Sequence, residues 1–234
     1  YTALSVVFIF IGIGILVTIY FTKSSTPEIK IPTAVISTFI PNQNERLLEI
    51  GRVAQEQVAE NFSIILQENF PNDSVTYIKI IRQNADSSAT DVDSETFFKN
   101  SFRNIPASLT RAFDKKMFVG IYTREKNHPF FILQIDSFDR AFEGMLAWEK
   151  NMYADIRPFW KGKEVVGGPT NIAQPLSSFE DLIVQNKDTR ILKNNQGETL
   201  LIYSFIDQKT LFIVDSESTF REILGRFTSS KLIR

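Results

Sequence analysis

The feature that most constrains this chain is its beginning, because Tyr1 to Thr22 contains no charged residue and Leu4 to Phe21 is almost wholly apolar. A helix of this length rises about 33 Å, which matches the hydrocarbon core of a bilayer at about 30 Å. Tyr20 and Phe21 lie near one end, where aromatic rings favour the headgroup level. The sequence therefore predicts a transmembrane helix over residues 1–22 that contacts the lipid bilayer.

Two other interpretations of this segment stay open. A cleaved secretory signal would have a basic start, a shorter apolar run and a small-residue cleavage site, and the segment shows none of these. Processed type IV pilins also begin without methionine, but Ser5 stands where they carry an acidic residue, and Pro27 and Pro32 end the helix early. We therefore favour a membrane anchor and expect the natural start to lie upstream of Tyr1.

The next segment, residues 23–44, is rich in Ser, Thr and Pro and has no helical period, so it predicts a stalk. A sizeable domain that follows an N-terminal anchor most often lies outside the cytoplasm. We therefore expect a single-pass protein of the cell membrane with an extracytoplasmic C-terminal domain. The expected organisation is a transmembrane helix (1–22), a stalk (23–44) and a soluble domain (45–234).

Composition narrows the function of that domain. The chain has 26 Lys and Arg against 27 Asp and Glu, so it lacks the strongly basic character of a nucleic-acid-binding protein. It has no cysteine and one histidine, which excludes disulfides, thiolate metal sites, a cysteine nucleophile and multi-histidine metal sites. Apolar residues make up 43% of the chain, which is enough for one or two domains with a hydrophobic core.

The soluble part is predicted to open with a long amphipathic helix, which Asn42 and Glu45 would cap and Asn69-Phe70-Pro71 would end. Its apolar residues recur at three- and four-residue steps, and they are Leu47, Ile50, Ala54, Val58, Phe62 and Ile65. This helix either packs on the domain's own sheet or forms a coiled-coil dimer seam, although the pattern lasts barely three heptads. Val75 to Arg82 (VTYIKIIR) is β-branched and aromatic and predicts a strand.

Asn84 to Asp93 is predicted to be a polar loop. Its Asp91 and Asp93 are interpreted as solvated turn carboxylates, because the glycine and glutamate of a calcium loop are missing. Ser94 and Pro106 are each expected to open a short helix.

A hairpin followed by a helix is the most informative pattern. Met117 to Thr123 (MFVGIYT) and Pro129 to Asp136 (PFFILQID) predict the hairpin, and Ser137 opens the helix. The apolar face of that helix is expected to consist of Phe138, Phe142, Met145, Trp148, Met152 and Ile156.

The same pattern occurs again near the C-terminus. Glu198 to Ser204 and Thr210 to Asp215 predict a hairpin, and Ser216 or Ser218 opens a second helix. The aligned positions are Ile121-Tyr122-Thr123 with Ile202-Tyr203-Ser204, and Phe142 and Leu146 with Phe220 and Leu224. The chain is therefore predicted to contain a duplicated β-hairpin and helix unit.

Between the two units, Pro158 to Leu176 predicts an irregular connection. Phe179 to Gln185 and Thr189 to Lys193 predict a further hairpin with Asn186-Lys187-Asp188 as its turn. Together the elements predict an α+β fold, a sheet with helices packed against it.

The residues that often carry chemistry form no recognisable site. His128 is predicted to lie in a surface turn, without the nucleophile and orienting partner of a catalytic histidine. The acidic candidates are Asp136, Asp139, Glu143, Glu149 and Asp155. Asp136 and Asp139 are expected to cap a helix, and Glu149-Lys150 to form a solvated edge. No nucleotide-binding motif is present, so no catalytic, cofactor-binding or metal-binding residue is assigned and no cofactor is expected.

Three stretches carry a resemblance. They are HPFFILQIDSFDRAFEGMLAWEKNM within Phe118 to Trp160, then Asn186 to Leu192, and then LLIYSFIDQKTLFIVDSESTFREILGRF. This order resembles a group of uncharacterised single-pass membrane-anchored bacterial proteins with a Pro-containing stalk and a soluble domain. The resemblance implies a location in the bacterial envelope and a cytoplasmic segment before Tyr1, and it carries over no activity, cofactor or catalytic residue.

We therefore expect a membrane-anchored extracytoplasmic domain of the bacterial cell envelope that binds or scaffolds an envelope protein, or itself, without catalytic activity. One alternative is a subunit of an envelope assembly, such as a pilus or secretion apparatus, that oligomerises through Leu47 to Phe70. The other alternative is a membrane-tethered hydrolase. Nucleic acid is not expected as a partner.

Overall fold

The computed structural model describes residues 35–36, 39–51, 55–84, 88–161 and 178–232, which belong to one compact unit, Ala34–Arg234. The transmembrane helix predicted over residues 1–22 and most of the irregular connection predicted over Pro158 to Leu176 lie outside these residues. Within the described part, no helix is both long enough and apolar enough to cross a membrane. The mixed α+β class predicted from the sequence is confirmed.

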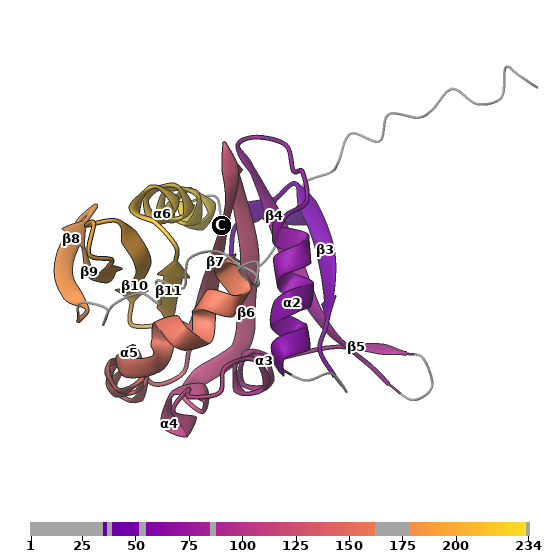
Figure 1. Cartoon of the computed structure of the whole chain (residues 1–234), viewed down its shortest axis with the longest axis horizontal. Coiled ribbons are helices and arrows are strands. Elements are labelled where there is room, and N and C mark those ends of the chain that lie inside the picture. The colour runs from indigo at the N-terminus through magenta and orange to yellow at the C-terminus, as the bar shows by residue number, and fades with distance from the viewer. Residues whose placement is uncertain (1–34, 37–38, 52–54, 85–87, 162–177, 233–234) are drawn as a thin grey trace, which may run out of the picture. The chain divides into compact units, whose positions relative to one another are not determined.

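A mixed sheet of nine described strands forms the centre of this unit (Figure 1). Its strands are β3 (Asn44–Glu49), β4 (Ser74–Gln83), β5 (Ala89–Asp91), β6 (Phe113–Arg124), β7 (Lys126–Ile135), β8 (Glu180–Val184), β9 (Lys187–Lys193), β10 (Thr199–Asp207) and β11 (Thr210–Val214). They lie in the order β3-β4-β6-β7-β11-β10-β9-β8, and β5 pairs with the C-terminal end of β4. β3 and β4 are parallel, and the other paired strands of this sheet are antiparallel. A separate two-stranded sheet joins β1 (Val35–Ile36) and β2 (Pro41–Asn42).

Helices cover both faces of the large sheet. The described helices are α2 (Gln55–Leu66), α3 (Ser94–Ser101), α4 (Ala107–Thr110), α5 (Phe138–Lys161) and α6 (Glu217–Leu232). Successive strand residues point to opposite faces, so each face has a core of its own. One face packs against α2, α3, α4 and α5 and is called the α5 face below; the other packs against α6 and is called the α6 face. α2 and α5 lie in front of the sheet in Figure 1.

Aromatic rings dominate the core of the α5 face. Phe98 of α3 and Phe102, which follows α3, both meet the ring of Phe131 on β7. Phe102 also lies 5.0 Å from Phe159 and 5.5 Å from Trp148 of α5, measured between ring centroids. Tilted and edge-to-face pairs of this kind add about 0.5–1.5 kcal/mol each beyond the area that they bury. The cluster therefore fixes α3 and α5 on the sheet.

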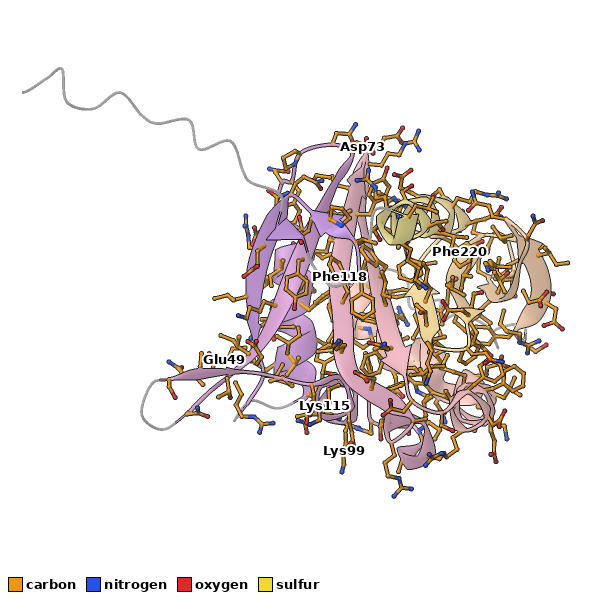
Figure 2. The ribbon with its side chains drawn as sticks, turned by 180° about the vertical axis from the view of Figure 1, so that it is seen from behind. Glu49, Asp73, Lys99, Lys115, Phe118 and Phe220 are labelled. Atoms are coloured by element: carbon orange, nitrogen blue, oxygen red, sulfur yellow. The ribbon has the colours of Figure 1, made fainter. Side chains whose placement is uncertain are left out.

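The α6 face has a smaller core. Phe118 of β6 stacks on Phe130 of β7 with ring centroids 5.6 Å apart, and Phe220 of α6 packs edge-on against Phe212 of β11. Figure 2, seen from behind, labels Phe118 on the sheet and Phe220 on α6.

The domain begins earlier than the sequence predicts. Phe39 and Ile40 belong to the core of the α6 face, and Ile40 is fully buried. The sequence predicts a stalk over residues 23–44, but Phe39 and Ile40 within that range are thus part of the folded domain.

The prediction of a single long helix from residue 45 is wrong, because the first part of this segment is a strand. Asn44–Glu49 form β3, whose parallel register places Leu48 opposite Ile80 of β4, and α2 begins only at Gln55. Leu48 is buried while Leu47 is 58% exposed, as expected for an edge strand with one covered face.

The second part of that prediction is confirmed as a helix that packs on its own sheet. α2 buries Val58, Phe62 and Ile65 in the core of the α5 face. These side chains are not available to a dimer seam, so the continuous coiled coil proposed over Leu47 to Phe70 does not form.

The polar loop predicted before α3 has structural roles. Ala89–Asp91 form β5, and Asp91 pairs with Lys79 at 3.2 Å. Asp93, not Ser94, caps α3, because its carboxylate accepts a hydrogen bond from the backbone N–H of Thr96 at 2.8 Å. The two carboxylates predicted to be solvated turn residues therefore each have a partner.

The predicted hairpins are all present. β6 pairs with β7, β10 with β11, and β8 with β9. The turn between β8 and β9 consists of Gln185 and Asn186, both with positive φ, one residue earlier than predicted. A two-residue turn of this kind matches the right-handed twist of the strands that it joins.

The two hairpin and helix units are present but do not superpose by rotation. β7 and β11 are adjacent and antiparallel, so the two-fold rotation that superposes the hairpins runs perpendicular to the sheet and leaves each face in place. α5 and α6 nevertheless cover opposite faces. The aligned tyrosines also lie on opposite faces. Tyr122, in the unit that ends with α5, belongs to the α6 face, and Tyr203, in the unit that ends with α6, belongs to the α5 face.

Candidate functional site

A groove of about 580 Å³ opens on the α5 face, between the first half of α5 and strands β9 and β10. Its apolar wall and its floor are formed by Phe138, Phe142 and Leu146 of α5, Arg190 of β9, and Tyr203 and Phe205 of β10. We call this the α5 groove. Concave sites of this size, mostly apolar with a few placed polar groups, are the usual form of binding sites.

The apolar wall is exposed. Phe138 is 36% exposed, Phe142 44% and Leu146 40%. The sequence predicts Phe138 and Phe142 on the face of the helix that meets the core, and this is wrong. The contact with the sheet is filled by the neighbouring stripe of α5, which consists of Ala141, Met145, Trp148, Met152, Ile156 and Phe159.

Aromatic contacts keep this wall in place. The ring of Phe205 lies 5.1 Å from that of Phe138 and 5.9 Å from that of Phe142, measured between centroids. Phe138 and Phe142 are themselves stacked at 5.9 Å. The three rings thus form a preformed apolar surface within the groove.

A network of charged and polar side chains includes the floor residues Arg190 and Tyr203. Arg190 donates to both oxygens of Glu149, from Nε at 2.8 Å and from Nη2 at 2.9 Å, and Nη1 donates to Asp181 at 2.9 Å. The hydroxyl of Tyr203 donates to Oε1 of Glu149 at 2.6 Å. The prediction that Glu149 and Lys150 form a solvated edge is therefore wrong for Glu149, whose side chain is 16% exposed. Two-pronged pairing of this kind fixes the guanidinium plane.

Tyr203 and Arg190 both stay protonated in this network. Burial raises the pKa of the Tyr203 hydroxyl, and its hydrogen bond to the Glu149 carboxylate raises it further. Hydrogen bonds to Glu149 in the first place, and to Asp181, raise the pKa of the Arg190 guanidinium. The donors around Glu149 therefore keep one arrangement across the physiological pH range.

Carboxylates outnumber cations along the groove. Asp181, Asp188 and Asp207 line it and are exposed, and Arg190 is the one cation among its described lining residues. Arg190 is already paired with Glu149 and Asp181, whereas Asp207 pairs with Lys231 at 2.8 Å. The groove thus combines an apolar wall on α5 with an excess of carboxylates among its described lining residues.

Asp155, another acidic candidate, has a structural role. It is 8% exposed, and its carboxylate accepts from Nε1 of Trp148 at 2.8 Å. It also accepts from the backbone N–H of Asn104 at 3.1 Å and from its side-chain amide at 2.9 Å. Because these donors offset the cost of burying the carboxylate, Asp155 fixes α5 to the loop that follows α3.

His128 is buried, so the surface turn predicted for it is wrong. It is 7% exposed on β7, and its Nδ1 lies 2.7 Å from Oδ2 of Asp215. Asp215 also accepts from the hydroxyl of Thr219 at 3.0 Å, so the pair joins β7 to the start of α6. A Ser-His-Asp hydrolase needs a hydroxyl at the other ring nitrogen, and no hydrogen bond of the described residues places one there.

The remaining candidates are not brought to the groove. Asp136, Asp139 and Glu143 are exposed and are not among its described lining residues. Asp139 lies in the first turn of α5, where a carboxylate opposes the helix dipole. In the described ranges, no group of three or more His, Cys, Asp and Glu residues is arranged to hold a metal ion.

The sequence does not predict Arg190, Tyr203 and Phe205 as site residues. They lie far from α5 along the chain, and only the pairing of their strands in the folded sheet brings them beside it. One local signal points to the groove. Phe138, Phe142 and Leu146 recur at four-residue steps beside a second apolar stripe, so the apolar face of α5 is wider than its contact with the sheet requires.

No protein-family model matches the chain, and neither the curated proteins nor the solved structures contain a match.

Proposed function

We propose that this chain is a single-pass membrane protein of the bacterial cell envelope whose extracytoplasmic α+β domain binds an envelope protein through the α5 groove. The uncharged apolar run of residues 1–22 supports the anchor. The resemblance of the soluble part to membrane-anchored bacterial proteins supports the envelope location. The observation that carries the binding role is the exposed stripe of Phe138, Phe142 and Leu146.

The chemistry of the groove favours a protein partner. Apolar patches rimmed by polar residues mark interaction sites on soluble domains. Aromatic residues and arginine are enriched among the residues that contribute most to protein interfaces, and the groove combines both types. A membrane anchor would confine the domain to one surface, which raises its local concentration near partners in the same membrane.

The experiment compares two charge insertions in the full chain, expressed in bacterial cells. Leu146→Glu places a carboxylate in the groove, and Ile64→Glu places one on α2 at a side chain that is 59% exposed. After crosslinking in intact cells and detergent extraction, we expect wild type and Ile64→Glu to retain the same envelope protein. Leu146→Glu should lose at least about tenfold in yield, because a charge in an apolar interface costs more than about 1.4 kcal/mol.

Two results would contradict the proposal. One is an undiminished partner yield from Leu146→Glu, provided that its tryptophan fluorescence matches wild type and so reports a folded domain. The other is recovery of cytoplasmic proteins alone, which would place the domain on the opposite side of the membrane.

A further inference from the structure

We infer that the partner segment in the α5 groove is an amphipathic helix with a basic polar side, which lies beside α5 on strands β8, β9 and β10. The inference rests on the proposed function, because it names the partner of the same groove. Three observations carry it: an uncovered part of the sheet, the width of that part, and the charge at its rim.

Among the described residues, no helix covers the α5 face at its β8 edge. The strand register places Asp181 opposite Arg190, and Ile183 opposite Asp188, on the face that carries Tyr203. Ile183 is 69% exposed, the highest value among the large apolar side chains of the described strands. This isoleucine adds an exposed apolar side chain at the β8 edge, beyond Asp188 of β9, which lies opposite it.

The width of the uncovered part suits one helix. From β10 to β8 there are two inter-strand spacings, which amount to about 10 Å. An α-helix with its side chains is about 10–12 Å wide, and packed helices lie about 8–10 Å apart. A helix seated there would contact Phe142 and Leu146 on one side and Ile183 on the other. An extended segment paired with the edge of β8 would leave the α5 wall uncovered.

The charge at the rim selects a basic partner. Asp181 and Asp188 are exposed and line the groove, and Asp181 shares its one arginine with Glu149. Lysine or arginine at the border between the apolar and the polar side of the bound helix, where it faces β8 and β9, would lie near both carboxylates. Rim pairs contribute at most about 1 kcal/mol each, so the apolar contacts supply the affinity while the charges orient the helix and exclude acidic segments.

The test maps where the partner touches the groove. A photoreactive benzoylphenylalanine replaces Phe142 in one version of the full chain and Ile183 in another, and crosslinked peptides are identified by mass spectrometry after irradiation of cells. We expect both positions to label the same segment of another protein. Each position by itself should label residues three, four or seven apart, which is the spacing of one helix face. That segment should carry an excess of lysine and arginine.

A charge variant tests the rim independently. Asp181→Asn with Asp188→Asn should lower the yield of the adduct from position 142 about fivefold, since two exposed pairs are lost at about 0.5 kcal/mol each. The matched control is Glu95→Gln with Glu125→Gln, two exposed carboxylates away from the groove, which should leave the yield unchanged.

Each other outcome overturns the inference. Residues two apart labelled from one position would indicate an extended partner. An acidic segment would exclude charge selection, and labelling of this chain itself would make the occupant a part of the chain or a second copy. In all three cases the groove still binds, as the loss with Leu146→Glu would show. Absence of any adduct, together with no effect of Leu146→Glu, would instead contradict the proposed function.

Discussion

α5 and α6 carry the same residue types at the same spacing and use them differently. Phe142 and Leu146 of α5 are 44% and 40% exposed, whereas the aligned Phe220 and Leu224 of α6 are 0% and 5% exposed. α6 holds its face of the sheet with this pair. α5 has a second stripe for that purpose, so its pair adds little to the fold and is free to contact a partner. The exposed fraction therefore distinguishes apolar residues that stabilise the domain from apolar residues that are available to bind a partner.

The largest expected effect is on stability, and it comes from the aligned phenylalanines. Phe220→Ala should lower the free energy of unfolding by about 3–5 kcal/mol, because a fully buried ring leaves a cavity beside Phe212. Phe142→Ala should lower it by about 0.5 kcal/mol, since the site is already partly solvated. Urea unfolding of the detergent-solubilised full chain, followed by tryptophan fluorescence, measures both. Equal losses would show that Phe142 belongs to the core and would remove the contrast between the helices.

Glycines sharpen the same contrast, with a smaller effect. A Cβ on Gly144 of α5 would lie 2.6 Å from Cβ and 2.9 Å from Cα of Leu109, so Gly144 lets α4 approach α5. Gly144→Ala should therefore cost about 1–3 kcal/mol, because backbone must shift. Gly225 of α6 has open space around it, and Gly225→Ala should gain about 0.5–1 kcal/mol from helix propensity. The same unfolding measurement compares them, and a stabilising Gly144→Ala would contradict the close packing of α4 on α5.

The sequence predicts those elements whose pattern is local. The runs around Val119 and Phe131 are buried on both faces and read as strands, and the polar residues between them mark the turn. α5 follows from its helical period in the same way. The prediction is wrong for β3, which is an edge strand with one covered face. The three-residue spacing of Leu47 and Ile50 matches the period of a helix. Its strand state depends on parallel pairing with β4, which no local pattern encodes.

The site is less predictable than the fold because its polar contacts are distant along the chain. Glu149 meets Arg190 across 41 residues and Tyr203 across 54. His128 is buried through Asp215, which lies 87 residues further on. From the sequence alone, a carboxylate or an imidazole with polar neighbours is predicted to be solvated. Only the folded chain shows that such a side chain is buried against a partner. Sequence reasoning therefore identifies the helix that carries the groove but not the strands that complete it.

The aligned tyrosines give the smallest expected effect. Tyr203 donates to Glu149 at 2.6 Å and Tyr122 donates to Asp73 at 2.9 Å, but the acceptors differ in exposure, at 16% for Glu149 and 71% for Asp73. Removing a hydroxyl costs more where water cannot replace it. Tyr203→Phe should therefore lower the free energy of unfolding by about 1 kcal/mol, and Tyr122→Phe by about 0.5 kcal/mol.

The pH dependence of the Tyr203→Phe effect follows from the direction of one pKa shift. Burial, and then the hydrogen bond to Glu149, hold the pKa of Tyr203 above the value of about 10 that it has in the unfolded chain. A group whose folded pKa is raised contributes fully below its unfolded pKa and loses that contribution as pH rises above it. The stability difference between wild type and Tyr203→Phe should thus be constant from about pH 7 to 9 and shrink above about pH 10. Urea unfolding across this range measures it, and a difference that grows above about pH 10 would mean that the folded state favours the phenolate, which the Glu149 carboxylate opposes.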